Sequence, residues 1–162
     1  MYRIKHKISS GNWQRVINFD FECQDFFTIT TDKFIIRITG GSIIISDKIN
    51  DAPISRIKGY NYLYTGDVTP DEKDLFALEN GKHFYIVSLE DFKQKLKVTL
   101  PRSFESIDTY GSYSKDGKHL YIPVQKYVDK QRKYWLCEYE TTRYSLVSME
   151  EISKSNVTFW YS

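Results

Sequence analysis

Apolar and polar residues alternate in short runs along most of this chain, a pattern typical of antiparallel strands with one face in a core. Turn-forming residues separate the runs, and Asn80-Gly81 between two of them is a strong hairpin signal. The pattern predicts an all-β chain with less than about a tenth of its residues in helix. In chain order, the predicted strands are Tyr2–Ile8, Trp13–Phe21, Phe26–Thr30, Phe34–Thr39, Ser42–Ser46, Pro53–Ile57, Tyr64–Val68, Leu75–Leu78, Phe84–Leu89, Leu96–Leu100, Tyr110–Ser114, Leu120–Val124, Tyr134–Tyr139, Tyr144–Ser148 and Asn156–Tyr161.

Two segments do not follow the strand pattern. Lys126–Lys133 is rich in charge, so it is predicted to be the long tip of a hairpin. Met149–Ser153 is the one candidate for a helical turn.

One segment of the chain is repeated. Gly66–Phe76 aligns with Gly111–Tyr121, and a fainter copy, Phe26–Ile36, lies upstream. The turn aspartates of the three copies, Asp32, Asp71 and Asp116, are 39 and 45 residues apart. A strand–turn–strand unit that recurs at about 40–45 residues has the period of a β-propeller blade.

The turn of the third copy, Ser114–Tyr121, resembles the "Ser/Thr-x-Asp-Gly-Lys-x-Leu-aromatic" hairpin of WD40-like and TolB-like β-propeller repeats. The second copy has Glu72 at the glycine position, and the first copy is two residues shorter there. The resemblance implies an open or incomplete β-propeller-like arrangement of about three four-stranded antiparallel blades plus extra terminal strands. It also implies acidic residues after each third strand, where the chain has Asp47, Glu90-Asp91 and Glu140-Thr141. A β-sandwich with the same number of strands is the rival fold.

The repeat predicts one all-β domain with five parts. These are terminal strands in 1–21, repeats in 22–58, 59–103 and 104–150, and a terminal strand in 151–162. The strands in 1–21 fit the outer half of a preceding blade, and Asn156–Tyr161 fits the first strand of a following one.

Charge and hydropathy narrow the function classes. Twenty-three basic and 21 acidic residues give a net charge of +2, which indicates neither a nucleic-acid-binding nor a membrane-binding surface. The first residues contain no apolar signal region, and no run approaches the roughly 18 apolar residues of a membrane span. We therefore expect a cytoplasmic protein without direct contact to nucleic acid or membrane.

The residues that most often carry chemistry are scattered. His6, His83 and His119 do not pair at metal-ligand spacing, and Cys23 and Cys137 are far apart. We expect both thiols to be buried and unpaired. No catalytic residues, metal or cofactor are predicted.

Acidic residues and tyrosines are most concentrated between Tyr60 and Asp74. The candidate partner-binding residues are Tyr60, Tyr62, Tyr64, Asp67, Asp71, Glu72 and Asp74. The tyrosines alternate, so they are expected on one strand face, where they serve either packing or partner contact. The carboxylates are compatible with solvation of a turn, with acid–base chemistry, or with binding a basic partner.

Without a catalytic constellation, the leading function is a non-catalytic protein-binding module. The most specific hypothesis is a bacterial immunity protein that neutralises a cognate toxin, such as a basic nuclease domain. One alternative is a propeller-type hydrolase or lyase fragment that is active only when oligomerisation completes a channel. Another is a fragment of a scaffold propeller.

Overall fold

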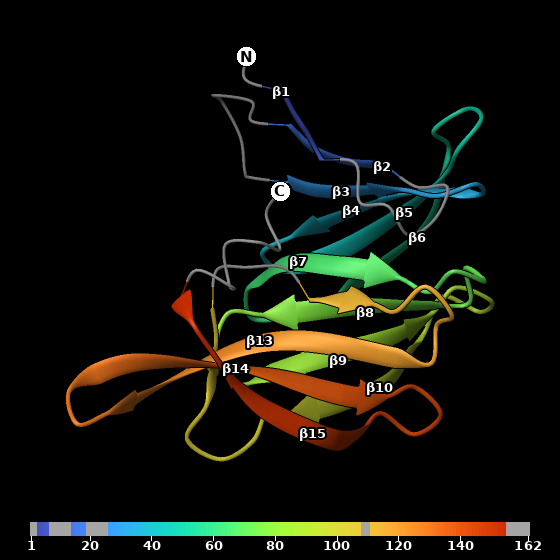
Figure 1. Ribbon diagram of the computed structural model, residues 1–162. Helices are drawn as coiled ribbons and strands as arrows, with labels where there is room; N and C mark the ends of the chain where they lie inside the picture. The colour runs from blue at the N-terminus through green and yellow to red at the C-terminus, as the bar shows by residue number, and fades with distance from the viewer. Residues whose placement is uncertain (1–2, 7–13, 19–25, 108–110, 155–162) are drawn as a thin grey trace.

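The computed structural model describes residues 3–6, 14–18, 26–107 and 111–154, and it shows three antiparallel sheets stacked on one another (Figure 1). The all-β prediction and the open, blade-like arrangement are confirmed. No helix in the described part of the chain is long and apolar enough to cross a bilayer.

The first sheet contains the first repeat. Its strands follow the order β1 (Arg3–His6), β2 (Gln14–Asn18), β3 (Phe26–Thr30), β4 (Phe34–Thr39), β5 (Ser42–Asp47) and β6 (Pro53–Lys58). Because β2 pairs with β3 along its length, the two terminal strands extend the sheet of the first repeat. They are not part of a separate preceding blade.

The second sheet contains the second repeat, and its strands deviate from the predicted bounds by only one or two residues. They are β7 (Leu63–Val68), β8 (Asp74–Glu79), β9 (His83–Ser88) and β10 (Gln94–Thr99). The order β10-β9-β8-β7 is that of a simple four-stranded meander. This is the blade that the Asn80-Gly81 turn predicted most directly.

The third sheet departs further from the prediction. It contains β11 (Glu105–Ser106), β12 (Ser112–Tyr113), β13 (His119–Val128), β14 (Gln131–Glu140) and β15 (Ser145–Ile152). The predicted long loop Lys126–Lys133 is wrong, because β13 and β14 pair as far as Val128 and Gln131. Asp129 and Lys130 make a tight turn with φ values of 49° and 63°. The predicted helical turn Met149–Ser153 is also wrong, because β15 continues to pair with β14 up to Ile152.

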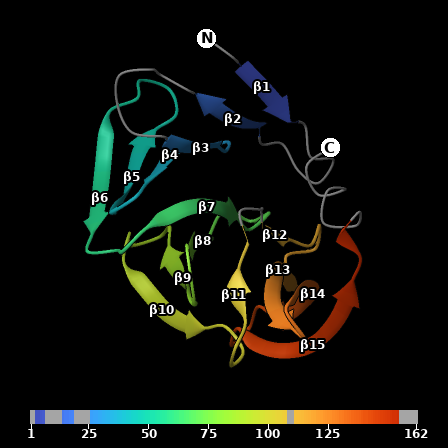
Figure 2. The same ribbon diagram turned by 90° about the vertical axis from the view of Figure 1, so that its left-hand side faces the viewer.

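The sheets stack face to face through two hydrophobic clusters. Alternate residues of β8 point to opposite faces, so Leu75 and Ala77 pack towards the first sheet while Phe76 and Leu78 pack towards the third. The first cluster includes Ile29, Ile36, Ile38, Ile43 and Ile45, and the second includes Leu120, Ile122, Val124, Cys137 and Tyr139. In Figure 2, β6, β10 and β15 lie at the periphery, and β3, β7 and β12 lie nearer the middle.

Two glycines that the repeat aligns allow this stacking. A Cβ atom on Gly66 would lie 2.6 Å from Ile38 Cδ1 of the first blade, and one on Gly111 would lie 2.6 Å from the Phe76 ring of the second blade. The repeated glycine therefore marks positions where neighbouring blades approach closely.

Cys137 is buried in the second cluster and has no disulfide partner, as predicted. Burial raises the pKa of its thiol to about 12. Cys23 and the predicted strand Asn156–Tyr161 lie outside the described residues.

Candidate functional site

The candidate site is a pocket of about 320 Å³ between the second and third blades, which we call the acidic pocket. It lies where the β7–β8, β9–β10, β12–β13 and β14–β15 turns meet, at the right-hand end of the molecule in Figure 1. Its charged lining residues are the carboxylates Asp71, Asp74, Glu90 and Asp116 and the ammonium groups Lys73 and Lys95. The lining therefore favours a positively charged group.

The same hydroxyl contact shapes the turn in each blade. Thr69 Oγ1 accepts hydrogen bonds from the amides of Lys73 and Asp74, at 3.2 and 3.0 Å. Ser114 Oγ accepts one from the His119 amide at 3.0 Å, and Thr31 Oγ1 accepts one from the Phe34 amide at 2.9 Å. These side chains hold the turns in place without help from a ligand.

The aspartates at the tips of two turns also cap their own backbone. Asp71 Oδ1 accepts a hydrogen bond from the Lys73 amide, and Asp116 Oδ1 accepts one from the Lys118 amide. Ser114 Oγ donates a further hydrogen bond to Asp116 at 2.6 Å and lowers the pKa of that carboxyl group. Both aspartates are exposed, and each lines the pocket from a turn that internal hydrogen bonds hold.

One tyrosine, Tyr144, lines the acidic pocket, and its hydroxyl contacts a second tyrosine behind it. The hydroxyl of Tyr144 lies 2.9 Å from that of Tyr113 and donates to Asp74 Oδ2 at 3.3 Å. Lys95 Nζ lies 2.8 Å from Asp74 Oδ1. Burial raises the pKa values of Tyr113 and Tyr144, so both phenols stay neutral beside the carboxylate.

The four predicted acidic residues fall into three separate environments. Asp71 and Asp74 line the acidic pocket. Glu72 is half-buried and faces the first blade, where its Oε1 accepts a hydrogen bond from the Asp32 amide at 2.5 Å. Its φ of 56° is a conformation that favours glycine, and Gly117 has the equivalent φ of 71° in the third blade.

Asp67 is a correction to the predicted surface. It is only 1% exposed, and its carboxylate accepts hydrogen bonds from the amides of Val68 and Tyr113. It is therefore a structural residue that joins two blades, and no partner can reach it in this arrangement.

The tyrosines are a second correction, because they do not share one exposed face. Tyr60 is 9% exposed and packs edge-on against Tyr85, with 4.7 Å between ring centroids. Tyr64 is half-buried, and its hydroxyl donates to the Ile107 carbonyl at 2.5 Å. Tyr62 is 54% exposed. The alternation fails because β7 begins at Leu63, so Tyr60 and Tyr62 precede the strand.

The tyrosines and the acidic pocket also lie at opposite ends of β7. Leu63 begins this strand of six residues and Val68 ends it next to the acidic turn, about 17 Å away at the usual rise of a strand. The predicted surface Tyr60–Asp74 is therefore two surfaces.

Sequence reasoning missed Glu90, Lys95, Asp116 and Tyr144 as pocket residues. Asp116 had a usable signal, because the repeat aligns it with Asp71. Tyr144 and Lys95 had none, because only the packing of one blade on the next brings them to Asp74. Within the described residues, no group of three or more His, Cys, Asp or Glu side chains is arranged to hold a metal ion.

Comparison with solved structures identifies the fold. Hydrazine synthase of Kuenenia stuttgartiensis matches with a TM-score of 0.63 and 12% identity, over 90% of this chain and 47% of that one. The Swd1 β-propeller domain of Myceliophteria thermophila matches with a TM-score of 0.60 and 14% identity, over 86% and 55%. The WD40 repeats of RRP9 match with a TM-score of 0.57 and 14% identity, over 73% and 35%.

The chain thus spans about half the length of these solved structures, or less. No protein-family model matches its sequence, and a search of curated proteins found no match. At 12–14% identity the similarity establishes the fold alone. That fold consists of stacked, WD40-like β-propeller blades, as the repeat predicted.

Proposed function

We propose that this chain is a non-catalytic protein-binding module whose acidic pocket receives basic side chains of a partner protein. The supporting observation is the pair of exposed aspartates Asp71 and Asp116, which come from two different blades and line one pocket. Because their turns are already fixed by internal hydrogen bonds, little conformational entropy is lost when a cation binds between them.

The ion pair in the wall of the pocket suggests how a partner would bind. Lys95 is 47% exposed in its side chain, whereas Asp74 is 15% exposed, so the lysine is the mobile member. A lysine or arginine of the partner can replace Lys95 on Asp74 without leaving a buried carboxylate unpaired. Glu90 adds negative charge at the rim.

We further propose that the partner is a toxin and that the chain is a bacterial immunity protein. The sign of the pocket fits a basic toxin such as a nuclease, whose phosphate-binding surface is positively charged. Covering that surface would block the toxin without any chemistry by this chain. Tyr62 stays in the proposal as an exposed contact residue outside the pocket, whereas Tyr60 is buried and the hydroxyl of Tyr64 is bound to the Ile107 carbonyl.

Coexpression with a toxin tests the proposal, and the first toxin to use is any that a neighbouring gene encodes. The wild-type chain should restore growth, and the double variant Asp71→Lys/Asp116→Lys should not. Glu150→Lys is the matched control, because it reverses an exposed charge on β15 away from the acidic pocket. Absence of protection by the wild-type chain contradicts the immunity function, and equal protection by the wild type and both variants contradicts the role of the pocket.

A further inference from the structure

A second pocket, of about 440 Å³, lies between the end of β14 nearest the β13–β14 turn and the end of β15, away from the acidic pocket. We call it the basic pocket. It is lined by Arg132, Lys133, Tyr134, Glu151, Ile152 and Lys154. In Figure 1 this hairpin projects at the left-hand end of the molecule, opposite the turns that form the acidic pocket.

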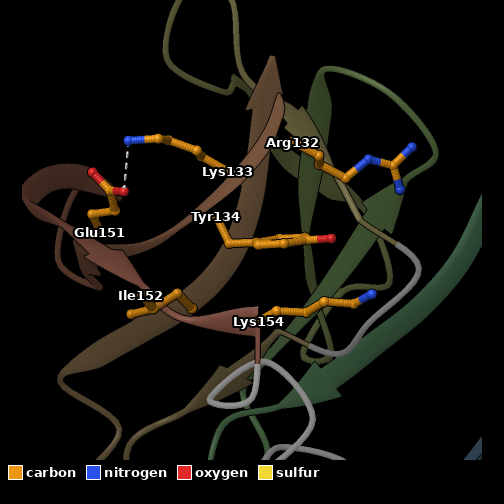
Figure 3. Close-up of a pocket in the computed structure, with 6 residues that line it drawn as sticks. All are labelled: Arg132, Lys133, Tyr134, Glu151, Ile152 and Lys154. Carbon is orange, nitrogen blue, oxygen red and sulfur yellow. Dashed lines mark ion pairs between the residues drawn. The ribbon is translucent and has the colours of Figure 1, made fainter. Parts of the chain in front are cut away.

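Three donor groups of the basic pocket face the same way. Because side chains alternate along a strand, Arg132 and Tyr134 share one face of β14 and Lys133 lies on the other. Figure 3 shows the ends of Arg132, Tyr134 and Lys154 directed to one side. Lys133 points away from them and pairs with Glu151 at 3.2 Å.

The end of β15 brings two positive charges to the same pocket. Tyr134 pairs with Ile152, the last residue of β15, and Lys154 follows two residues later and lines the pocket together with Arg132. Like charges that line one pocket repel each other. None of the ion pairs among the described residues includes Arg132 or Lys154. An anion between them would offset their repulsion.

The arginine is already oriented by the facing strand. Arg132 Nη2 donates a hydrogen bond to the Tyr127 hydroxyl at 2.8 Å, and the guanidinium carbon lies 5.4 Å from the centre of the Tyr127 ring. A guanidinium held in this way retains donors for a second, bidentate contact with a carboxylate or phosphate. Pre-organisation reduces the entropy lost on binding.

We propose that Arg132, Tyr134 and Lys154 bind an anionic group, a carboxylate or a phosphate, carried by an acidic segment of a protein partner. A nucleic acid is the less suitable ligand, because a polyanion needs a long track of cations. The basic pocket has three cations and one carboxylate, and the whole chain has a net charge of only +2. The two pockets are separate, so this site does not depend on the acidic pocket.

Nuclear magnetic resonance titration tests the site directly. The probes are inorganic phosphate, a short glutamate-rich peptide and a single-stranded oligonucleotide. We expect saturable shifts of the Arg132 Nε–H signal and of the Tyr134 and Lys154 amides with phosphate, with the peptide, or with both. A response to phosphate alone indicates a phosphorylated segment, and a response to the peptide indicates carboxylates.

Variants with matched controls complete the test. Arg132→Gln and Lys154→Gln should each weaken binding of the responding probe about tenfold, because each removes a charge-assisted hydrogen bond. Lys58→Gln is the control, since it removes an exposed charge on β6, outside the basic pocket, and it should leave binding unchanged. All three side chains are on the surface, and unchanged amide spectra elsewhere verify folding.

Three results would overturn the proposal. The first is no saturable shift with either phosphate or the peptide. The second is an equal loss of binding in Lys58→Gln and Arg132→Gln, which would reveal unspecific attraction. The third is tighter binding of the oligonucleotide than of the peptide, which would assign the surface to nucleic acid.

Discussion

Asp67 Oδ2 accepts a hydrogen bond from the backbone amide of Tyr113, with 2.9 Å between the two atoms. The bond joins β7 to β12, the inner strands of two neighbouring blades, across 46 residues of sequence. The same carboxylate accepts a hydrogen bond from the Val68 amide at 2.8 Å. A buried carboxylate with two backbone donors thus fixes how the second and third blades meet.

Replacing Asp67 should destabilise the whole stack. Asp67→Ala leaves the Tyr113 amide buried without its acceptor, so we expect the free energy of unfolding to fall by about 2–3 kcal/mol. Urea denaturation followed by tyrosine and tryptophan fluorescence measures this change. Asp91→Ala is the control, since Asp91 is exposed, and it should change stability by less than about 0.5 kcal/mol. Equal stability of the two variants would show that the inner-strand contact is dispensable.

Gly111→Ala tests the close approach of the blades. The added methyl group would lie 2.6 Å from the Phe76 ring, so we expect a loss of about 1–3 kcal/mol in stability. Gly41→Ala provides the comparison, because its nearest contact would be an ordinary 3.8 Å. Gly111→Ala should cost less stability in a Phe76→Leu protein than in the wild type, because the smaller leucine leaves room for the added methyl group. A Gly111→Ala protein as stable as the wild type would contradict the packing described.

The ion pair between Arg37 and Asp51 in the first blade should lower the pKa of the Asp51 carboxyl group measured by pH titration. Hydrogen bonds from Arg37, with Nη2 2.6 Å from Asp51 Oδ2, hold the pKa of this carboxyl group below its usual range. Because the pKa of Asp51 is lower in the folded state than in the unfolded state, the ion pair raises the free energy of unfolding at pH values above the unfolded-state pKa. This contribution is lost as the pH falls through the folded-state pKa. A carboxyl-detected titration should show the Asp51 midpoint rising in Arg37→Gln. An unchanged midpoint would mean that the pair does not persist in solution.

The sequence predicted the strands well wherever alternation and a tight turn coincided. Asn80-Gly81 placed the second blade to within two residues, and the repeat placed the turns of Asp71 and Asp116 at equivalent positions. The extent of β13 and β14 was missed because charged residues such as Lys126 and Arg132 suggested a loop. The facing strand satisfies their backbone groups instead, and their side chains reach solvent.

The candidate site was predicted only in part, because its formation depends on contacts between blades. Asp67 and Asp71 are both acidic and only four positions apart, yet one is buried and the other lines the acidic pocket. Nothing in the local pattern separates them, since the Tyr113 amide that binds Asp67 comes from another blade. The role of Tyr144 beside Asp74 was unpredictable for the same reason.

The most direct test of the central claim is the association rate with the purified partner at low and high salt. Opposite charges speed encounter, and salt screens them beyond roughly 10 Å at 0.1 M. The account predicts that Asp71→Lys/Asp116→Lys slows association about tenfold or more at low salt and much less at high salt, whereas Glu150→Lys has little effect. An unchanged association rate in the double variant, with unchanged salt dependence, would contradict partner binding through the acidic pocket.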